Sequence, residues 1–247
     1  MSVYQDIIHR TEQGRKQLAV LVDPDKMLNR DVENLARNAA EAAVDYFFVG
    51  GSLLVNNELD HCIKTVKASS HIPVILFPGN NMQLSWQADA ILFLSLISGR
   101  NAEMLIGRHV IAAPYLKLSP LEVISCGYML VENGKTTAVQ YMSNTMPIPA
   151  DKMDIAICTA MAGEMLGLKL IYLEAGSGAQ QCVPTTMIGQ VKQNISIPLL
   201  AGGGIRTPEQ ANEAATAGAD IIVIGTAFEK NPGLISEMAD AVHHGTK

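Results

Sequence analysis

Short apolar runs recur along the chain, and polar or glycine-rich turns separate them. Such runs are typical of buried parallel strands. Stretches with apolar residues at helical spacing lie between most of them. The predicted strands are Leu18–Asp23, Tyr46–Gly50, Pro73–Phe77, Ala90–Leu94, Tyr128–Val131, Lys169–Glu174, Ile197–Ala201 and Ile221–Gly225. The predicted helices are Asn29–Ala43, Leu53–Ser69, Asp151–Gly167, Thr186–Asn194, Pro208–Ala217 and Gly233–His243.

A repeated strand–helix order with parallel crossovers forms either a doubly wound sheet or a closed barrel. Eight repeats favour the barrel, and no segment has the composition of a linker. We therefore predict an α/β protein, a (β/α)8 TIM barrel, that occupies residues 1–247 as a single domain.

Two stretches depart from the regular repeat. Only about ten residues, Asn80–Asp89, separate the third predicted strand from the fourth, whereas a full crossover needs a dozen or more. Either the third outer helix is missing, which would leave an apolar groove for a hydrocarbon chain, or a short helix with trimmed loops stands there. After the fifth strand, Asn133-Gly134 followed by Thr136–Met142 predicts a small hairpin.

Composition narrows the function classes. The formal net charge is -6 and no run of Lys or Arg occurs, so a nucleic-acid partner is not expected. Four scattered cysteines without a CxxC pair fit a reducing cytoplasm. The chain shows neither a signal-peptide pattern nor an apolar stretch of membrane-spanning length. We expect a cytoplasmic protein, with contact to a bilayer surface left open.

Glycine-rich loops follow the last two predicted strands. Ala201-Gly202-Gly203-Gly204 ends one strand, and Gly225-Thr226 ends the next. Glycine lets backbone N–H groups approach an anion closely, and in TIM barrels the loops after strands seven and eight commonly bind a phosphate. Thr207, Pro208 and Gln210 predict a helix N-terminus with a capping box directly after the first loop. The alternative is that these glycines only make tight turns.

Acidic and hydroxyl side chains follow the first two strands. Asp23 and Asp25 flank Pro24, with Lys26 next, and carboxylate oxygens are ligands that suit Mg²⁺. The alternative is a simple turn around Pro24. Ser52 could cap a helix or help to hold a metal-bound diphosphate.

The sixth strand ends in a further candidate site. The two-residue period of a strand places Tyr172 and Glu174 on one side and Leu173 on the other. If the first side faces the barrel mouth, Glu174 meets the ligand. The Gly176-Ser177-Gly178 turn then adds a third set of N–H groups.

Six segments together resemble the geranylgeranylglyceryl phosphate synthase family, which includes related bacterial prenylglyceryl phosphate synthases. The resemblance spans nearly the whole chain, and YLEAGSG within Tyr172–Ala179 is its most specific element. One departure is Leu21, where some bacterial members have a lysine two residues before the metal-binding aspartate. The segments are LVDPDK, VGGS, ILFPGN, YLEAGSGA, AGGGIR and VIGTA.

The resemblance implies a Mg²⁺-dependent prenyltransferase. Such an enzyme joins a long-chain prenyl diphosphate, most simply geranylgeranyl diphosphate, to the 3-hydroxyl of sn-glycerol 1-phosphate and forms an ether-lipid precursor. Asp23 and Ser52 match the metal positions of the family, and Asp23 and Glu174 would be catalytic. The matching glycerol-phosphate positions are Tyr172, Leu173, Glu174, Ala175, Gly176, Ser177, Gly178, Gly203, Gly204, Gly225 and Thr226.

Two other functions fit the same barrel. A phosphosugar isomerase or aldolase would use the same phosphate loops, although Asp23 lacks an obvious acidic or lysine partner for that chemistry. A non-catalytic barrel that binds a phosphorylated metabolite is the third choice. The prenyltransferase hypothesis requires Asp23 and Gly203 to open onto one cavity, with donor length set by a groove near Trp86 and Met104. A methionine-rich helix containing Met153, Met161 and Met165 favours a homo-oligomer.

Overall fold

Eight parallel strands close into a barrel in the computed structural model, which describes residues 1–27 and 29–245. Each strand pairs with its neighbour in sequence, and β8 returns to pair with β1. This confirms the predicted barrel. The strands are β1 (Gln17–Val22), β2 (Tyr46–Val49), β3 (Val74–Leu76), β4 (Ala90–Leu96), β5 (Glu122–Leu130), β6 (Leu170–Glu174), β7 (Leu199–Gly202) and β8 (Ile221–Ile224).

Alternation along the strands divides the apolar residues into two layers. Ala19, Tyr46, Ile75 and Tyr172 belong to a cluster that fills the inside of the barrel. Their sequence neighbours on the strands belong to a second cluster, packed between the sheet and the helices. Because successive strand residues point to opposite faces, the same alternation decides which side chains at the strand ends reach the barrel mouth.

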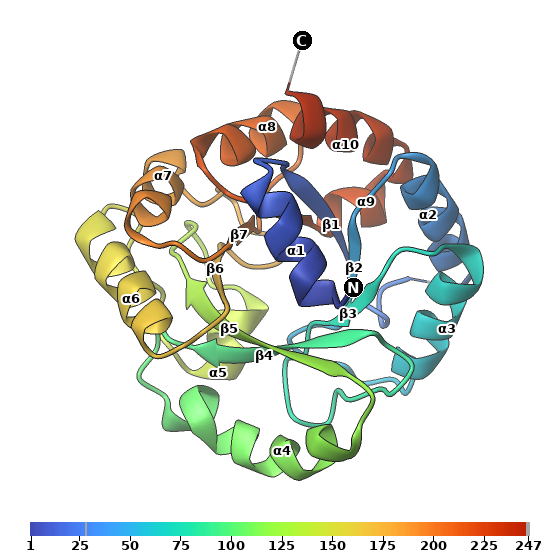
Figure 1. Cartoon of the computed structure of the whole chain (residues 1–247), viewed down its shortest axis with the longest axis horizontal. Helices are drawn as coiled ribbons and strands as arrows, with labels where there is room; N and C mark the ends of the chain where they lie inside the picture. The colour runs from blue at the N-terminus through green and yellow to red at the C-terminus, as the bar shows by residue number, and fades with distance from the viewer. Residues whose placement is uncertain (28, 246–247) are drawn as a thin grey trace.

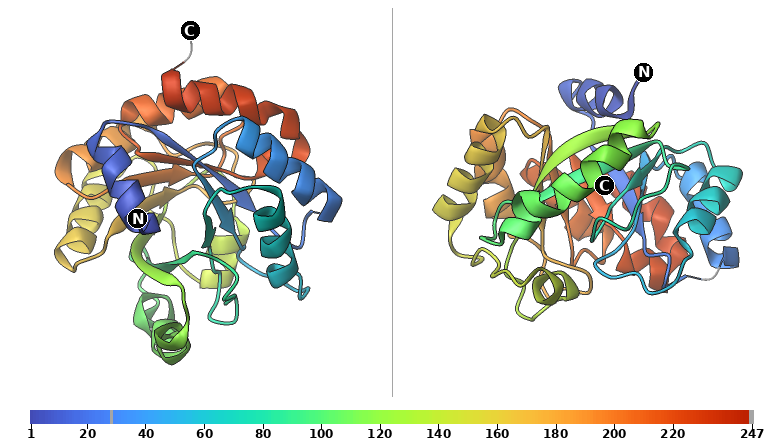
Figure 2. Two further views of the ribbon diagram at one scale, coloured as in Figure 1. Left: turned by 45° about the vertical axis from the view of Figure 1, so that its right-hand side comes forward. Right: turned by 90° about the horizontal axis from the view of Figure 1, so that it is seen from below.

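Most helices form a ring around the barrel, whereas α1 lies across the N-terminal ends of the strands and α5 lies at the barrel mouth (Figure 1). In Figure 2 (right), α1 and α5 lie at opposite ends of the molecule. Across the described residues, no helix has the length and apolar character needed to cross a membrane. The helices are α1 (Val3–Glu12), α2 (Asn29–Glu41), α3 (Leu59–Ser69), α4 (Arg108–Leu118), α5 (Ala138–Ser143), α6 (Met153–Met165), α7 (Thr185–Asn194), α8 (Pro208–Ala217), α9 (Thr226–Lys230) and α10 (Ile235–His244), with a π-helix η1 (Glu103–Gly107) and a 3-10 helix η2 (Pro232–Leu234).

The connection from β3 to β4 contains no helix, and every residue of it is described. Turns and extended backbone run from Phe77 to Asp89 instead. The missing third helix is therefore confirmed, and the alternative of a short helix is wrong. On the next connection, η1 and α4 cover this side of the barrel from further away, as the left view of Figure 2 shows.

The predicted hairpin after the fifth strand is wrong. Residues Ala138–Ser143 form α5, and Asn144 ends the helix with a left-handed conformation (φ 49°). The alternating pattern of Thr136–Met142 imitates a strand, but Val139 turns inward against the interior cluster, so packing at the barrel mouth outweighs the local preference. β5 is also longer than predicted, since Glu122 to Gly127 pair with β4.

Three aspartates close the N-terminal end of the barrel in the same way. Asp45, Asp89 and Asp220 each precede an even-numbered strand. Each accepts a backbone N–H near the start of the preceding strand, at 2.8 Å from Leu18, Val74 and Leu199, respectively. Each also pairs with a cation, namely Arg10, Lys67 and Lys192.

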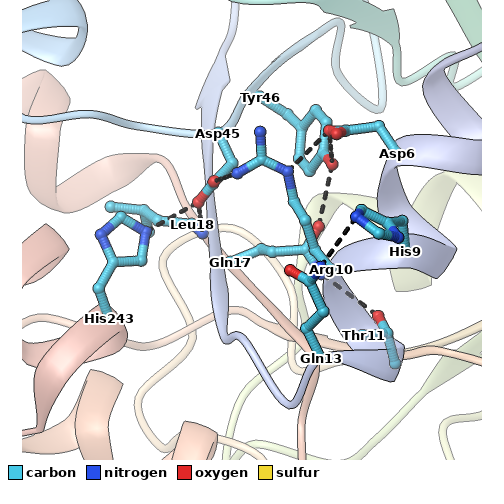
Figure 3. Close-up of polar contacts among 10 residues, drawn as sticks. All are labelled: Asp6, His9, Arg10, Thr11, Gln13, Gln17, Leu18, Asp45, Tyr46 and His243. Carbon is cyan, nitrogen blue, oxygen red and sulfur yellow. Dashed lines mark hydrogen bonds and ion pairs between the residues drawn. The ribbon is translucent and has the colours of Figure 1, made fainter. Parts of the chain in front are cut away.

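The Asp45 cluster also joins the two ends of the chain (Figure 3). Arg10 of α1 donates to one Asp45 oxygen at 2.5 Å, and His243 Nε2 of α10 lies 2.8 Å from the other. Tyr46 lies beside them, with its hydroxyl 2.8 Å from Asp6 and 2.9 Å from Gln17. This network holds α1 against the N-terminal end of the barrel interior.

Candidate active site

One cavity of about 450 Å³ opens at the C-terminal ends of the strands. The loops after β1, β2, β6, β7 and β8 line it, so Asp23 and Gly203 share one cavity, as the sequence predicted. This is the strand edge at which TIM-barrel enzymes carry their chemistry. The predicted site residues that line it are Asp23, Ser52, Tyr172, Glu174, Gly176, Ser177, Gly178, Gly203, Gly204, Gly225 and Thr226.

Two predicted residues do not line this cavity. Leu173 and Ala175 belong to the apolar layer between the barrel and the helices, because alternation turns their side chains away from the interior. The Ala175 N–H is also bonded to Gly202 O at 3.0 Å, within the β6–β7 ladder. The structure therefore brings together the alternate positions Tyr172 and Glu174 and leaves Leu173 and Ala175 behind them.

The glycine loops pack so closely that side chains would not fit. Gly203 has a φ of 82°, and a Cβ placed there would lie 2.4 Å from Glu174 Oε1 and 2.6 Å from the Gly176 nitrogen. The loops after β6 and β8 also meet, since Ser177 Oγ lies 3.4 Å from Thr226 Oγ1. Three loops thus bring backbone N–H groups and hydroxyls to one wall, an arrangement that suits an anion such as phosphate.

Arg206 braces this wall. Its guanidinium donates to the carbonyl oxygens of Ala179 and Gln180, so it holds the loop after β6 in place. Thr207 caps α8 and accepts the Gln210 N–H at 3.4 Å, as predicted. The capping box is incomplete, however, because the Gln210 side chain accepts from the Arg206 N–H at 2.8 Å instead of from Thr207.

The Glu174 carboxylate is buried and faces the cavity. Burial raises its pKa, while the nearby Tyr172 hydroxyl and the Gly176 N–H, 2.5 Å from Oε1, partly oppose that shift. The Tyr172 hydroxyl lies beside the carboxylate, yet it has no hydrogen bond of good geometry to any described residue. A carboxylate with a raised pKa is a better proton acceptor than an exposed one.

Asp23 directly follows β1. It faces inward because it lies two and four residues after the inward-facing residues Leu21 and Ala19. Lys26 Nζ lies 2.8 Å from Asp23 Oδ2 and 4.0 Å from Glu229. Asp25 has a structural role, since its carboxylate accepts the N–H groups of Val55 and Asn56 and so ties the loop after β1 to that after β2. Both loops are therefore fixed around Asp23.

The donor set around Asp23 suits a metal ion only in part. Gly51 lies against the carboxylate, because a Cβ placed there would come within 3.1 Å of Asp23 Oδ2, and Ser52 lines the same cavity. Within residues 1–27 and 29–245, no group of three His, Cys, Asp or Glu side chains could hold a metal. One carboxylate and one hydroxyl fit Mg²⁺, provided that phosphate oxygens and water complete its shell.

Three aromatic rings lie between the two walls. The centroids of Phe77, Tyr128 and Tyr172 lie 5.3 to 6.0 Å apart. Burial raises the pKa values of both tyrosines well above their ordinary value, so these side chains stay neutral. All three residues line the cavity, and aromatic rings at such a place favour a nearby cation.

An apolar groove adjoins the cavity where the third helix is missing. It has a volume of about 120 Å³, and Gly51, Ser52, Phe77, Tyr128 and Val139 line both spaces. Apolar side chains of the β3–β4 connection, β4, η1 and α4 form much of the remaining wall. Those walls include Leu84, Ile91, Phe93, Leu96, Met104, Ala112 and Leu116.

Trp86 does not line this groove, contrary to the sequence-based expectation, whereas Met104 does. Trp86 is exposed and borders a shallow hollow with Pro73, Asp89 and Glu122, near the N-terminal ends of the strands. It lies on the loop between β3 and β4, which returns to the bottom of the barrel before β4 begins.

The sequence alone did not single out Phe77, Tyr128 or Arg206. Tyr128 could have been found from the strand register, because it pairs directly with Tyr172. Phe77 stands at the end of a strand, at the position where inward side chains reach the mouth. For Arg206, whose partners lie 26 and 27 residues away, the sequence carries no local signal.

The chain is similar in sequence to a family of known proteins. The sequence model of the PcrB family matches residues 10–246. The geranylgeranylglyceryl phosphate synthase of Chitinophaga pinensis is 54% identical over 241 residues, which are 98% of this chain and 96% of that protein. That of Thermococcus kodakarensis is 46% identical over 224 residues, 90% of this chain and 88% of that protein.

A solved structure gives the same result. The (S)-3-O-geranylgeranylglyceryl phosphate synthase of Thermoplasma acidophilum, crystallised in complex with its substrate sn-glycerol-1-phosphate, matches with a TM-score of 0.92. It is 34% identical, and the match covers 98% of this chain and 99% of that chain.

Proposed function

The chain belongs to the PcrB family, and from this membership we propose that it is a prenyltransferase. Its substrates are sn-glycerol 1-phosphate and a long-chain prenyl diphosphate, and its product is an ether-lipid precursor. One observation carries the proposal: a polar cavity with three glycine-rich loops runs directly into an apolar groove, and five residues line both. A phosphorylated alcohol and a hydrocarbon chain can thus meet in one place.

The acceptor would bind at the glycine loops. Its phosphate would accept N–H groups at Gly203 and Gly225, and the Ser177 and Thr226 hydroxyls stand at the same wall. Glu174 would hold the glycerol hydroxyls from the barrel interior. The Thermoplasma acidophilum protein, which binds sn-glycerol-1-phosphate, supports this acceptor.

The reaction breaks the bond between the allylic carbon of the donor and its diphosphate oxygen. The 3-hydroxyl oxygen of the acceptor forms the new bond to that carbon, Glu174 takes the hydroxyl proton, and inorganic diphosphate leaves. Phe77, Tyr128 and Tyr172 would stabilise positive charge that develops on the allylic carbon and would keep water away from it. Binding the acceptor by its phosphate positions a weak nucleophile in advance.

Mg²⁺ is the cofactor that we propose, held by Asp23 and Ser52 together with the donor. When bound, it would neutralise the diphosphate as the allylic bond breaks. Because the chain offers so few ligands, we expect the metal to bind tightly only when diphosphate is present.

Geranylgeranyl diphosphate is the donor that we expect, because the relatives are geranylgeranylglyceryl phosphate synthases. The four cysteines of the chain are free, which suits a cytoplasmic enzyme. Ile155, Met165 and Leu166 of the α6 region are exposed apolar side chains, which supports a homo-oligomer.

The apolar groove argues against the two other functions. A phosphosugar isomerase, an aldolase or a phosphometabolite-binding barrel would use the glycine loops, but none of them needs a hydrocarbon channel that adjoins the cavity. Incubation with labelled sn-glycerol 1-phosphate, geranylgeranyl diphosphate and Mg²⁺ tests the proposal. We expect a labelled product that extracts into organic solvent, and no such product from any of these reactants alone. The absence of product with all three would reject it.

A further inference from the structure

Arg108 stands in the wall of the apolar groove without an ionic partner. It is the first residue of α4, it is half-buried, and its Nη1 donates to Gly79 O at 3.3 Å. Over the described residues, no carboxylate lies within ion-pair distance of its guanidinium. Glu103 also lines the groove, but its carboxylate lies over Gly107 and makes no pair with Arg108.

The Arg108 guanidinium has hydrogen-bond donors that the surrounding residues do not use. Arginine offers five N–H donors and keeps its charge at all relevant pH values. One long hydrogen bond to a carbonyl leaves most of those donors free, in a wall that is otherwise largely apolar. Because charge-assisted hydrogen bonds to an anion are stronger than a bond to a neutral carbonyl, this arrangement favours an anionic ligand.

The contacts of Gly79 indicate where such an anionic ligand would bind. A Cβ on Gly79 would lie 2.3 Å from Gly51 O and 2.8 Å from Ser52 Cα, so the chain segment that Arg108 touches is pressed against the Gly51–Ser52 loop. Gly51 and Ser52 line both the groove and the polar cavity. Arg108 therefore stands beside the junction of the two spaces, on the groove side, whereas Asp23 lines the polar cavity.

The backbone before Arg108 is unusual as well. The π-helix η1 ends here, and the Arg108 N–H bonds back to Glu103 O. A π-turn adds one residue to a helical turn and often occurs at functional sites. Here it leads from Met104, a groove residue, to Arg108 and then His109, both of which also line the groove.

We propose that Arg108 binds the diphosphate of the prenyl donor from the groove side, while Asp23 lines the neighbouring polar cavity. The inference rests on the proposed prenyltransferase function, because it names a binding residue for that donor. Lys26 is a weaker candidate, since Asp23 and Glu229 already neutralise its charge. A bidentate guanidinium suits diphosphate oxygens, and the apolar walls beyond it suit the attached hydrocarbon.

Arg108→Met tests the proposal, because it removes the charge and keeps a long apolar side chain. Titration calorimetry with inorganic pyrophosphate and Mg²⁺ measures the diphosphate contact directly, apart from catalysis. We expect affinity to fall about 10- to 100-fold, the effect of losing a charge-assisted hydrogen bond. The KM for geranylgeranyl diphosphate should rise in parallel, while the KM for sn-glycerol 1-phosphate stays unchanged.

Two further variants separate binding from structure. Arg108→Lys should restore part of the affinity, because it keeps the charge and loses the planar fork. Arg100→Met is the matched control, since Arg100 is exposed, donates only to the carbonyls of Ile97, Ser98 and Gly99, and lines neither space. It should bind pyrophosphate within about twofold of the unmodified protein.

Geranylgeraniol, which has the hydrocarbon chain but no diphosphate, should inhibit the unmodified protein and Arg108→Met equally. The proposal is overturned if folded Arg108→Met binds pyrophosphate as tightly as the unmodified protein does. It is also overturned if the variant loses affinity for geranylgeraniol and for pyrophosphate to the same degree. If the unmodified protein forms no ether product yet binds pyrophosphate through Arg108, the proposed function fails and the diphosphate site stands.

Discussion

Opposing influences act on the Glu174 carboxylate. Burial favours its protonated form, whereas the Gly176 N–H and the Tyr172 hydroxyl favour the charged form. Gly203 keeps the site compact, because a methyl group there would overlap the carboxylate. These contacts hold the carboxylate in one position, with its proton affinity raised, where the acceptor hydroxyl is expected.

Glu174→Gln should lower turnover by about 100- to 10,000-fold, the usual contribution of a general base. Phosphate binding should weaken much less, because the glycine loops are unchanged. Steady-state kinetics and calorimetry with sn-glycerol 1-phosphate check the two effects separately. Near-normal turnover would remove Glu174 from the mechanism.

The pH dependence provides the control for that variant. Since burial raises the pKa of Glu174, the acid limb of the rate profile should lie above the ordinary glutamate value of about 4.3. In that window the folded state holds more protons than the unfolded state, so the Glu174 contribution to the unfolding free energy falls as pH rises. Glu174→Gln lacks this loss, so its stability relative to the unmodified protein should increase with pH.

Asp23→Asn should remove the benefit of Mg²⁺. The metal contributes several kcal/mol to such reactions, so the rate at saturating Mg²⁺ should fall by at least about 100-fold. Asp60→Asn is the matched control, because Asp60 is exposed on α3 and does not line the cavity. Rates measured against Mg²⁺ concentration check this, and an unchanged metal response in Asp23→Asn would contradict our assignment.

At the scale of elements, α4 decides the shape of the groove. Ala112 is buried in its wall, whereas Val110 on the same helix is 65% exposed. Ala112→Phe should fill part of the groove and reduce kcat/KM for geranylgeranyl diphosphate, relative to geranyl diphosphate, by about tenfold or more. Val110→Phe should leave that ratio unchanged. Equal ratios in both variants would show that the donor chain lies elsewhere.

The elements that the sequence predicted well are those with a strong local pattern. The barrel strands are buried on both faces, so their apolar runs stand out. Their alternation also placed Tyr172 and Glu174 together correctly. The shortness of Asn80–Asp89 indicated the missing helix because chain length alone limits a crossover.

The elements that failed depend on contacts between distant segments. α5 replaced a predicted hairpin because Val139 packs on the barrel mouth. α1, which the sequence analysis did not predict, packs Ile7 against the interior cluster and is held by Asp45 and Glu122 across the barrel end. Arg108 and Ala112 line the groove only after β3, β4 and α4 have packed together. No local sequence pattern therefore identifies these two residues.

At the scale of the whole molecule, Asp45 joins α1, β1 and α10. Asp45→Ala leaves Arg10 and His243 without their shared carboxylate and removes an acceptor from the Leu18 N–H. Breaking a buried charge network of this kind should lower the unfolding free energy by about 3 kcal/mol. Urea denaturation checks this value.

Asp151→Ala is the control for that experiment. Asp151 forms an ion pair with Lys152, but its side chain is 77% exposed, so the change should be under about 1 kcal/mol. Because the Asp45 cluster lies at the far end of the barrel from the cavity, folded Asp45→Ala should keep its KM values. A loss of stability no larger than that of the control would contradict the role of the cluster.

The connection from Phe77 to Asp89 contains no helix to cover the sheet. Around most of the barrel a helix follows each strand, but beside β3 and β4 the cover is η1 and α4, which stand further away, and the tail of the donor lipid would fill the groove between them and the sheet. The hydrocarbon then acts as a removable piece of the hydrophobic core. Saturating donor would therefore raise the melting temperature, and its departure as product would loosen this sector once in every catalytic cycle.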